Sequence, residues 1–369
     1  MARILYLDPD CPTPYNPKRL EEGALGGTEA TIVRIAEGLA RRGHTVVVAQ
    51  GARTDTEYTI SGVRYQQLHW QQLANETFDT IVLLNTPKLL KQVRKHWPGV
   101  ALYLWIHCFP GKRRRKMLNK LAVNADATLL AVSETLKNTL EQHLAQYPTY
   151  GSKNNQTDIY AKVQRVYNPV DEQLVADNTP IDQNKLVFFS SPHKGLAQVL
   201  MAFKEVKKLL PQMKLYIAHP GYMPLPAGLE EEDVVVLGAL SHKEVLWHVR
   251  EALAVFYPQN TFKETFGLVF AEANAVGTPV LSHPLGAAEE VLENKQQLVD
   301  VSNKQTVAQT IQAWRNKQRP QVSLPAKFRI KQVLNRWEEL VGTIEPNRMP
   351  AEHPVYQTTR LHEAKKRYR

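Results

Sequence analysis

Two series of short apolar runs, separated by segments with turn or helix patterns, divide this chain into two similar halves. Runs of this kind are typical of parallel strands that are buried on both faces of a sheet. The first series is 3–7, 45–49, 80–84, 101–105 and 127–131, and the second is 185–189, 214–218, 233–237, 254–257 and 279–281. The pattern predicts an α/β fold with two doubly wound, Rossmann-like domains that face a central cleft.

A polar segment predicts the boundary between these domains. After Asn168-Pro169-Val170-Asp171 the chain has few apolar residues as far as Asn184, which is typical of an interdomain linker. A length of 369 residues also suits two domains of ordinary size. We therefore expect an N-terminal domain over 1–170 and a C-terminal domain over 171–342.

Cysteine content and apolar patterning indicate the cellular location of such a protein. Cys11 and Cys108 are the two cysteines, too few for a disulfide framework and without the spacing of a metal site. The run 1–7 has the pattern of a strand rather than a signal peptide, and no apolar stretch has the length of a membrane span. We expect a cytoplasmic protein, soluble or peripheral at the inner face of the cell membrane, with no bound metal.

Two carboxylates, Glu264 and Glu272, stand eight positions apart where a loop is predicted to enter a helix. A carboxylate accepts hydrogen bonds from two vicinal hydroxyls, so one acid can hold a ribose and the other a transferred sugar. Backbone N–H groups at the start of a helix bind anions, and those of Phe266, Gly267 and Leu268 are predicted to face a pyrophosphate between the acids. An isolated pair of acids at this spacing is an ordinary solvated helix face, but these neighbours favour a nucleotide-sugar site.

This segment, with the turn Gly277-Thr278-Pro279-Val280 after it, resembles glycosyltransferase family 4, whose retaining GT-B enzymes carry an E-x7-E motif. The resemblance extends over roughly residues 1–340 and implies a GT-B fold with an N-terminal acceptor domain and a C-terminal donor domain. It implies that the terminal segment, with the tail 343–369, returns to the N-terminal domain. It also implies that Glu264 is catalytic, that Glu272 binds the donor, and that neither a cofactor nor a metal is needed beyond the nucleotide-sugar substrate.

Lys194 follows the first apolar run of the second half. The resemblance implies that it is catalytic and neutralises the leaving diphosphate, because stabilising that charge is a large part of such catalysis. Many family members have an arginine a few residues ahead of this lysine, where this chain has Phe189, Ser190 and Ser191. Ser191 can donate a hydrogen bond to the donor but adds no charge, so His193 or another basic side chain is expected to compensate.

Two glycine-containing loops add to the resemblance. Gly26 and Gly27 come before an apolar-periodic helix over 30–42, and a loop here would let the backbone approach the donor phosphate or the acceptor. A lone Gly-Gly turn is otherwise an ordinary loop. The segment 284–291 resembles a second family loop, in which Glu289 is expected to hold the loop in place.

His107 closes the apolar run 101–105 and its extension through Ile106, so its imidazole is expected at the edge of the cleft. The resemblance places a histidine of the catalytic site beside the transferred sugar. Hydrogen bonding to a sugar hydroxyl is the role that we expect, since a retaining transfer needs no base to activate water. The alternative is a partly buried histidine that serves packing.

A run of consecutive cations follows His107 closely, in a chain with a net charge of +10. The run consists of Lys112, Arg113, Arg114, Arg115 and Lys116. An anionic membrane surface or a phosphate-bearing lipid acceptor would be attracted to this block, although a solvated basic start of a helix has the same composition. No nucleic-acid-binding motif accompanies the block, so nucleic acid is not an expected partner.

These observations predict a retaining hexosyltransferase that moves a hexose from a nucleotide-diphosphate sugar to a glycan or lipid-linked acceptor. Cell-envelope polysaccharide or glycolipid synthesis is the role that we expect. Two alternatives remain at this stage. One is a GT-B sugar-nucleotide epimerase, which would need a ring of acids and histidines for proton transfer. The other is a non-catalytic, basic membrane- or nucleic-acid-binding protein on a GT-B shell.

Overall fold

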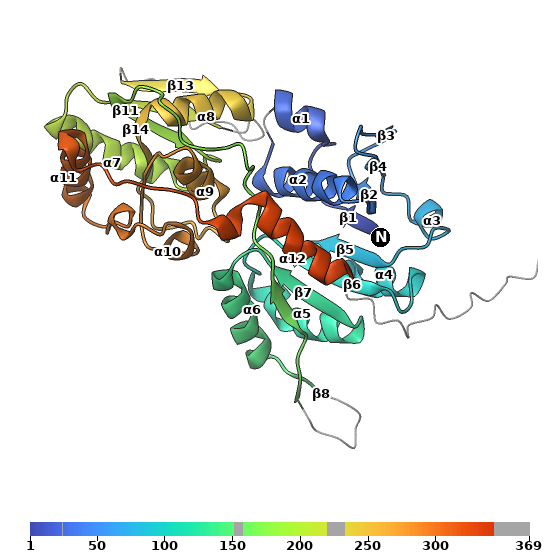
Figure 1. The fold of residues 1–369 in the computed structure, drawn as a ribbon. Helices are drawn as coiled ribbons and strands as arrows, with labels where there is room; N and C mark the ends of the chain where they lie inside the picture. Colours follow the sequence, from blue (N-terminus) through green and yellow to red (C-terminus); the bar gives the residue numbers. More distant parts are fainter. Residues whose placement is uncertain (24, 151–157, 220–232, 343–369) are drawn as a thin grey trace, which may run out of the picture.

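The computed structural model describes residues 1–23, 25–150, 158–219 and 233–342 (Figure 1). The tail 343–369, which we expected to join the N-terminal domain, lies outside the described residues. Within them, two separate α/β units follow each other along the chain, each with its own sheet covered by helices (Figure 1). The predicted fold class is therefore confirmed.

The first unit has a sheet of eight strands in the order β10-β7-β6-β5-β1-β2-β4-β3. All neighbouring pairs are parallel except β3 with β4, which is an antiparallel edge. The strands are β1 Arg3–Asp8, β2 Thr45–Gln50, β3 Thr56–Tyr58, β4 Arg64–Gln67, β5 Thr80–Leu84, β6 Ala101–Ile106, β7 Ala127–Ala131 and β10 Val163–Arg165. A separate antiparallel pair consists of β8 Thr149–Tyr150 and β9 Asp158–Ile159.

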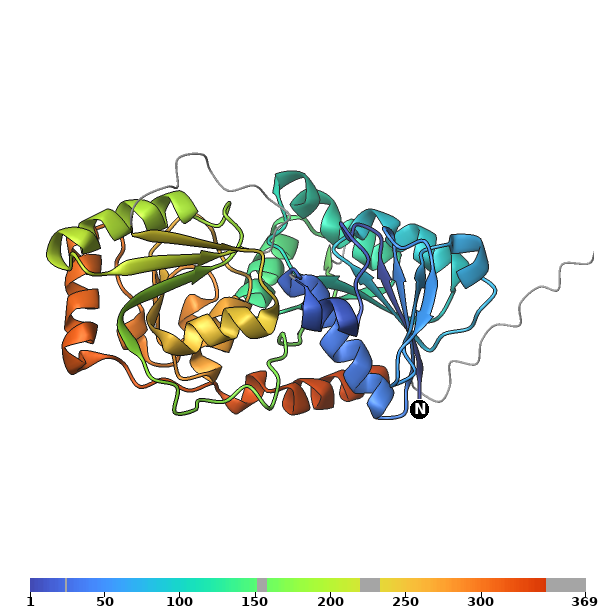
Figure 2. The same cartoon turned by 90° about the horizontal axis from the view of Figure 1, so that it is seen from above.

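The helices of the first unit connect these strands and cover both faces of the sheet (Figures 1 and 2). They are α1 Pro17–Glu22, α2 Gly27–Arg41, α3 Trp70–Leu73, α4 Leu90–His96, α5 Lys112–Asn124 and α6 Glu134–Gln146, with a 3-10 turn, η1, at Pro87–Leu89. All five strands that the sequence predicts for this half are present. β3, β4 and β10 were missed because they are short and contain few apolar residues.

The second unit has a parallel sheet of five strands in the order β13-β12-β11-β14-β15. The strands are β11 Asp182–Phe189, β12 Lys214–Ala218, β13 Val234–Gly238, β14 Ala252–Tyr257 and β15 Val280–Ser282. The helices are α7 Leu196–Leu209, α8 His242–Glu251, α9 Leu268–Ala275, α10 Ala288–Val291, α11 Lys304–Ala313 and α12 Ile330–Gly342, and the short turns are η2 Lys295–Gln297, η3 Trp314–Gln318 and η4 Ala326–Phe328. All five predicted strands of this half are present, and every residue of β14 is buried, as expected for a central parallel strand.

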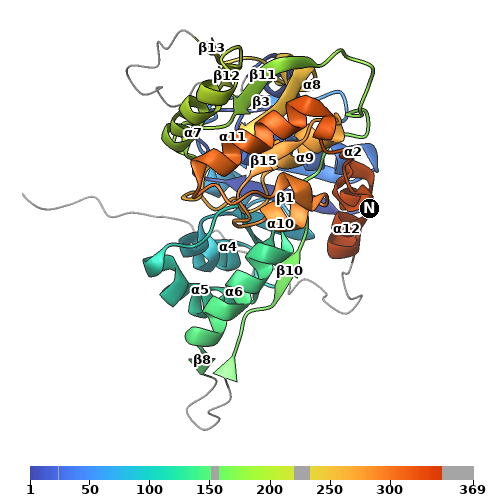
Figure 3. The same cartoon turned by 90° about the vertical axis from the view of Figure 1, so that its left-hand side faces the viewer.

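The last helix, α12, crosses back and packs against the N-terminal unit, beside α2 (Figures 2 and 3). Trp337 of α12 is fully buried and makes an edge-to-face contact with Trp105 at a centroid distance of 4.8 Å. A Cβ added at Gly38 of α2 would lie 2.6 Å from Cδ1 of Leu334, so glycine allows the two helices to approach closely. The chain passes between the two units at two places, near Val170 and near Phe328. These two segments pair with each other, and Val170 N donates to the carbonyl oxygen of Phe328 at 2.8 Å.

Candidate functional site

The loop and helix that carry the two acids fold as the sequence predicts. Gly267 caps α9 with a φ of 82°, a left-handed conformation that favours glycine, and the helix begins at Leu268. A Cβ at Gly267 would also lie 2.5 Å from a ring carbon of Phe270. Glu264 thus lies in the loop before the helix, and Glu272 lies in its second turn.

Glu264 is a buried carboxylate with two side-chain donors. Lys194 Nζ lies 2.9 Å from its Oε1 and 3.1 Å from its Oε2, and the Tyr257 hydroxyl donates to Oε1 at 2.9 Å. Its side chain is 7% exposed, whereas that of Lys194 is 26% exposed. The structure therefore brings two predicted catalytic residues, 70 positions apart, into direct contact.

The backbone of Glu264 is held by the loop 284–288. Ala287 N donates to the Glu264 carbonyl oxygen at 2.9 Å, and Gly286 forms a parallel bridge with Glu264. Gly286 has a φ of 66°, and a Cβ there would lie 2.5 Å from the Glu264 carbonyl oxygen. Only glycine fits this close approach, so the loop fixes the position of Glu264.

The segment ahead of Lys194 supplies no cation. Ser190 and Ser191 are buried, and Gly195, with a φ of 95°, caps α7. Burial and the Lys194 charge lower the pKa of His193, which favours its neutral form. Lys194 Nζ itself lies 4.9 Å from the centroid of the Phe262 ring, a cation–π contact. The expected compensation by His193 is thus not favoured.

Glu272 contacts the side chains of an arginine and a histidine, and the sequence analysis predicted neither contact. Arg34 Nη2, from the N-terminal unit, donates to Glu272 Oε1 at 3.1 Å, and His242 Nε2 lies 2.9 Å from the same oxygen. Burial alone would raise the pKa of Glu272, but His242 and Arg34 lower it to about 2. Glu272 is therefore an ionised carboxylate at neutral pH, and it links the two halves of the chain.

The region around α9 is an interface between the two units. A Cβ on Gly27, at the start of α2, would lie 3.2 Å from Leu268 Cδ1, so the glycine loop approaches α9 directly. Thr265 Oγ1 donates to the His107 carbonyl oxygen at 2.8 Å. Gly26 caps α2 at an ordinary negative φ. Phe266 is buried and packs edge-to-face on Phe328 at 5.2 Å.

A further contact between the two units is made by the residue next to Glu289. Glu289 has an exposed side chain, and it is Glu290 that crosses to the N-terminal unit. Its carboxylate accepts hydrogen bonds from the N–H groups of Glu134 and Thr135, at 2.8 and 2.9 Å, at the start of α6. A carboxylate at this end of a helix is stabilised by the helix dipole. Glu290 therefore attaches α10 to the N-terminal unit, a contact that the sequence did not predict.

His107 directly follows β6, and its ring packs against Trp105 in a tilted arrangement, at a centroid distance of 4.5 Å. Burial lowers its pKa to about 3, so the imidazole is neutral at physiological pH. Its Nε2 is buried and has no hydrogen-bond partner among the described residues. A neutral ring can exchange a hydrogen bond with a hydroxyl but is a weak general base at pH 7.

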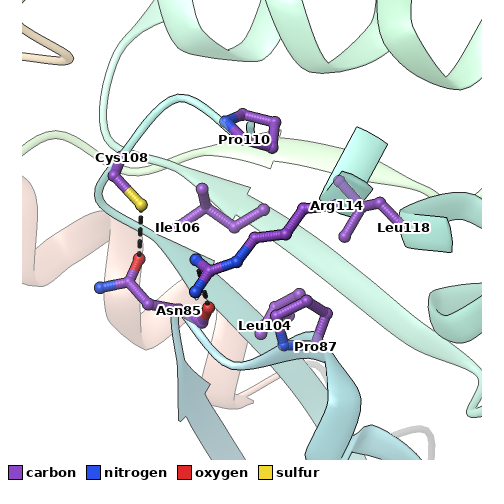
Figure 4. A pocket seen from close by; sticks show the side chains of 8 residues that line it. All are labelled: Asn85, Pro87, Leu104, Ile106, Cys108, Pro110, Arg114 and Leu118. Atoms are coloured by element: carbon purple, nitrogen blue, oxygen red, sulfur yellow. Dashed lines mark hydrogen bonds between the residues drawn. The ribbon is translucent and has the colours of Figure 1, made fainter. Parts of the chain in front are cut away.

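The cationic block begins helix α5 and borders a small pocket (Figure 4). Arg114 Nη1 donates to the Asn85 carbonyl oxygen at 3.3 Å, and Arg115 Nε donates to the Pro110 carbonyl oxygen at 2.9 Å. Lys112, Arg113 and Lys116 are exposed. The lining of the pocket is mostly apolar: Asn85, Pro87, Leu104, Ile106, Cys108, Pro110, Arg114 and Leu118.

Asp8, at the carboxyl end of β1, is a buried acid that the sequence analysis did not single out. Burial raises its pKa to about 6, although the Tyr15 hydroxyl donates to its Oδ2 at 2.9 Å. It lies on the edge of the sheet where ligands bind in doubly wound folds. Among the described residues, no group of three or more His, Cys, Asp or Glu side chains is arranged to hold a metal.

Comparisons with known proteins agree with this architecture. Residues 172–330 match the family described as "Glycosyl transferases group 1", and no curated protein matches the chain by sequence. The chain is similar in structure to AviGT4, a glycosyltransferase involved in avilamycin A biosynthesis (TM-score 0.57, 15% identity, 93% of this chain and 97% of that chain covered).

Two further structures are similar over their whole length. One is HepE from Anabaena, solved with UDP and glucose (TM-score 0.57, 16% identity, 93% of this chain and 100% of that chain covered). The other is a glycosyltransferase from Rickettsia africae (TM-score 0.58, 13% identity, 92% and 99% covered). Residues 172–330 are therefore similar to the group 1 glycosyltransferases, and the fold of the chain is that of the GT-B glycosyltransferases.

The raised pKa of Asp8 predicts how stability depends on pH. With a folded pKa of about 6 against 3.8 in the unfolded chain, protonated Asp8 stabilises the fold below pH 3.8, and this stability is lost as the pH rises through 6. Asp8→Asn should therefore raise the free energy of unfolding at pH 7.5 by about 1–3 kcal/mol. The gain should shrink towards pH 4.

Urea unfolding at both pH values measures this effect. Glu21→Gln, which changes an exposed acid of α1 in the same unit, is the matched control. An equal change at pH 7.5 and pH 4 would contradict the assignment to the Asp8 proton.

Proposed function

We propose that this chain is a retaining hexosyltransferase of the family 4 type, which moves a hexose from a nucleotide-diphosphate sugar to a glycan or lipid-linked acceptor. The observation that carries the proposal is the contact of Lys194 with Glu264 in the loop before α9, eight positions ahead of Glu272. The first acid matches the sugar of such a donor, the cation and the helix start match its diphosphate, and the second acid matches its ribose. A role in cell-envelope polysaccharide or glycolipid synthesis remains part of the proposal.

Each group of the site has one role in this proposal. Glu272 holds the ribose hydroxyls, and the free amides at the start of α9 receive the diphosphate, since the first N–H groups of a helix lack intrahelical partners. Glu264 holds hydroxyls of the hexose. Lys194 stabilises the charge that develops on the diphosphate as the bond from the sugar breaks. The neutral imidazole of His107 hydrogen-bonds a hydroxyl beside the reacting carbon.

UDP is the first nucleotide to test. HepE from Anabaena was solved with UDP and glucose, and an α-glucosyltransferase that shares the fold at a TM-score of 0.55 and 12% identity was solved with UDP. These are properties of those proteins. GDP and ADP complete the panel, because the site residues named above contact groups that all three nucleotides share.

The acceptor is proposed to lie at a membrane surface reached through α5. The first turn of α5 contains several cations and no acidic residue. The positive end of the helix dipole repels these cations, and an anionic surface nearby would offset that repulsion. Met117 on the same helix is 49% exposed. Among the described residues no helix is long and apolar enough to cross a bilayer.

The donor site predicts separate effects for the two acids. Glu272→Ala should weaken UDP binding by roughly 10- to 100-fold, because a charge-assisted hydrogen bond contributes about 1.5–3 kcal/mol. Glu264→Gln and Lys194→Ala should lower turnover more than donor affinity, since both groups act on the breaking bond. Calorimetry with UDP and product formation from radiolabelled donor measure the two quantities.

The control is Glu293→Ala, an exposed acid of the same unit. Unchanged UDP affinity in Glu272→Ala would overturn the ribose assignment, and full turnover in both other variants would overturn the mechanism. NMR of the product tests retention separately, because an inverted anomeric carbon is incompatible with the proposal.

The basic block predicts binding to anionic vesicles. Each cation near an anionic surface contributes about 1 kcal/mol, so replacing Lys112, Arg113 and Lys116 with Ser should weaken vesicle binding on the order of 100-fold. Arg114 and Arg115 are left in place because they hold the adjoining loop. UDP affinity should not change.

Co-sedimentation with anionic and neutral liposomes at low and high salt measures this effect. The control removes the same charge from the other unit by replacing three exposed lysines with Ser: Lys214, Lys243 and Lys304. Equal binding of the native chain to neutral and anionic vesicles would remove the membrane from the proposal.

A further inference from the structure

Arg34 reaches from the N-terminal unit into the proposed donor site. It lies seven positions after Gly27, two turns along α2, so both residues are on the same face of that helix. Leu268 and Glu272 are four positions apart and share one face of α9. Gly27 approaches Leu268 and Arg34 contacts Glu272, so these two helix faces meet across the interface.

The guanidinium of Arg34 is only partly satisfied by this contact. Its side chain is 8% exposed, and Nη2 donates to Glu272 Oε1. Nη1 is buried and has no hydrogen-bond partner in the part of the chain that the structure describes. A buried donor without a partner is costly, more so when it carries charge. An anionic oxygen brought by a ligand would satisfy Nη1.

The cations near the start of α9 do not balance the charge of a bound diphosphate. A nucleoside diphosphate at the start of this helix carries at least two negative charges, whereas Lys194 is already paired with Glu264. His193 has a lowered pKa, and Ser190 and Ser191 replace the basic residue expected there. The guanidinium of Arg34 is positively charged and has five N–H donors. The carboxylate of Glu272 accepts from only some of them.

We propose, on the basis of the nucleotide-sugar site above, that Arg34 is a donor-binding residue that supplies the second cation for the diphosphate from the opposite domain. Nη2 keeps Glu272 in position for the ribose, and Nη1 donates to a phosphate oxygen. The binding site for the nucleotide is then complete only when both units are in contact.

Calorimetry with the full-length chain tests this inference. UDP, GDP and ADP are the probes, and the diphosphate that binds most tightly is compared with its own nucleoside. Arg34→Met should weaken diphosphate binding tenfold or more and nucleoside binding by a clearly smaller factor, because the nucleoside loses only the positioning of Glu272. Arg41→Met, an exposed arginine of the same helix, should change neither.

A second background separates a direct contact from an effect through Glu272. In Glu272→Gln chains, Arg34→Met should still weaken diphosphate binding, because the phosphate contact does not need the carboxylate. If Arg34→Met has no effect in that background, Arg34 only positions Glu272 and the inference is wrong. Tighter binding in Arg34→Met would also overturn it, and would show that Arg34 competes with the ribose for Glu272.

Arg34→Lys keeps the measurement informative if the methionine variant is poorly folded. The lysine ammonium lacks the planar fork with which a guanidinium can contact Glu272 and a phosphate at the same time. This variant should therefore bind the diphosphate several-fold more weakly. Full diphosphate affinity would contradict the inference. If the native chain binds no member of the panel, the proposed function itself fails. If the native chain binds one of these diphosphates, and Glu272→Ala weakens that binding while the Arg34 variants do not, only the role proposed for Arg34 is wrong.

Discussion

A buried carboxylate has to be paired, and the pairing of Glu264 organises the site in this chain. Lys194 and Tyr257 satisfy the carboxylate, while the backbone of the loop 284–288 fixes its position. These contacts join the ends of β11 and β14 to the start of α9. The arrangement places a cation, an acid and a helix start together at the edge of the second sheet where ligands of doubly wound folds bind.

The second organising feature is the set of polar contacts between the two units. Arg34 with Glu272, Thr265 with the His107 carbonyl and Glu290 with the start of α6 all involve the α9 region or its neighbouring loop. Breaking a buried ion pair by removing one partner costs several kcal/mol, on the order of 3–5. Residues with proposed roles in binding therefore also hold the units together, and ligand binding and domain arrangement are expected to be coupled.

Local pattern was enough to predict most of the fold. Ten strands were predicted because each contains a continuous apolar run, whereas β10, with Val163, Gln164 and Arg165, has no such run. The start of α9 was also predictable, since Gly267 marks a helix cap. The acids and Lys194 were predicted from a family resemblance, and their contact with each other required the fold.

The parts that were missed depend on long-range geometry. Arg34 lies 238 positions from Glu272 on an amphipathic helix, and no local signal distinguishes it from Arg41 or Arg42. Glu289 and Glu290 differ by one residue, or about 100° around a helix, and only the packing of α10 decides which one crosses the interface. The raised pKa of Asp8 likewise follows from burial, which a sequence does not state.

A crystal structure of the chain with UDP, or with the nucleoside diphosphate that it binds most tightly, tests the central claim most directly. The account predicts that the ribose hydroxyls lie within hydrogen-bonding distance of Glu272 and that the phosphates lie at the start of α9, next to Lys194. A nucleotide bound elsewhere, or one whose ribose points away from Glu272, would contradict it.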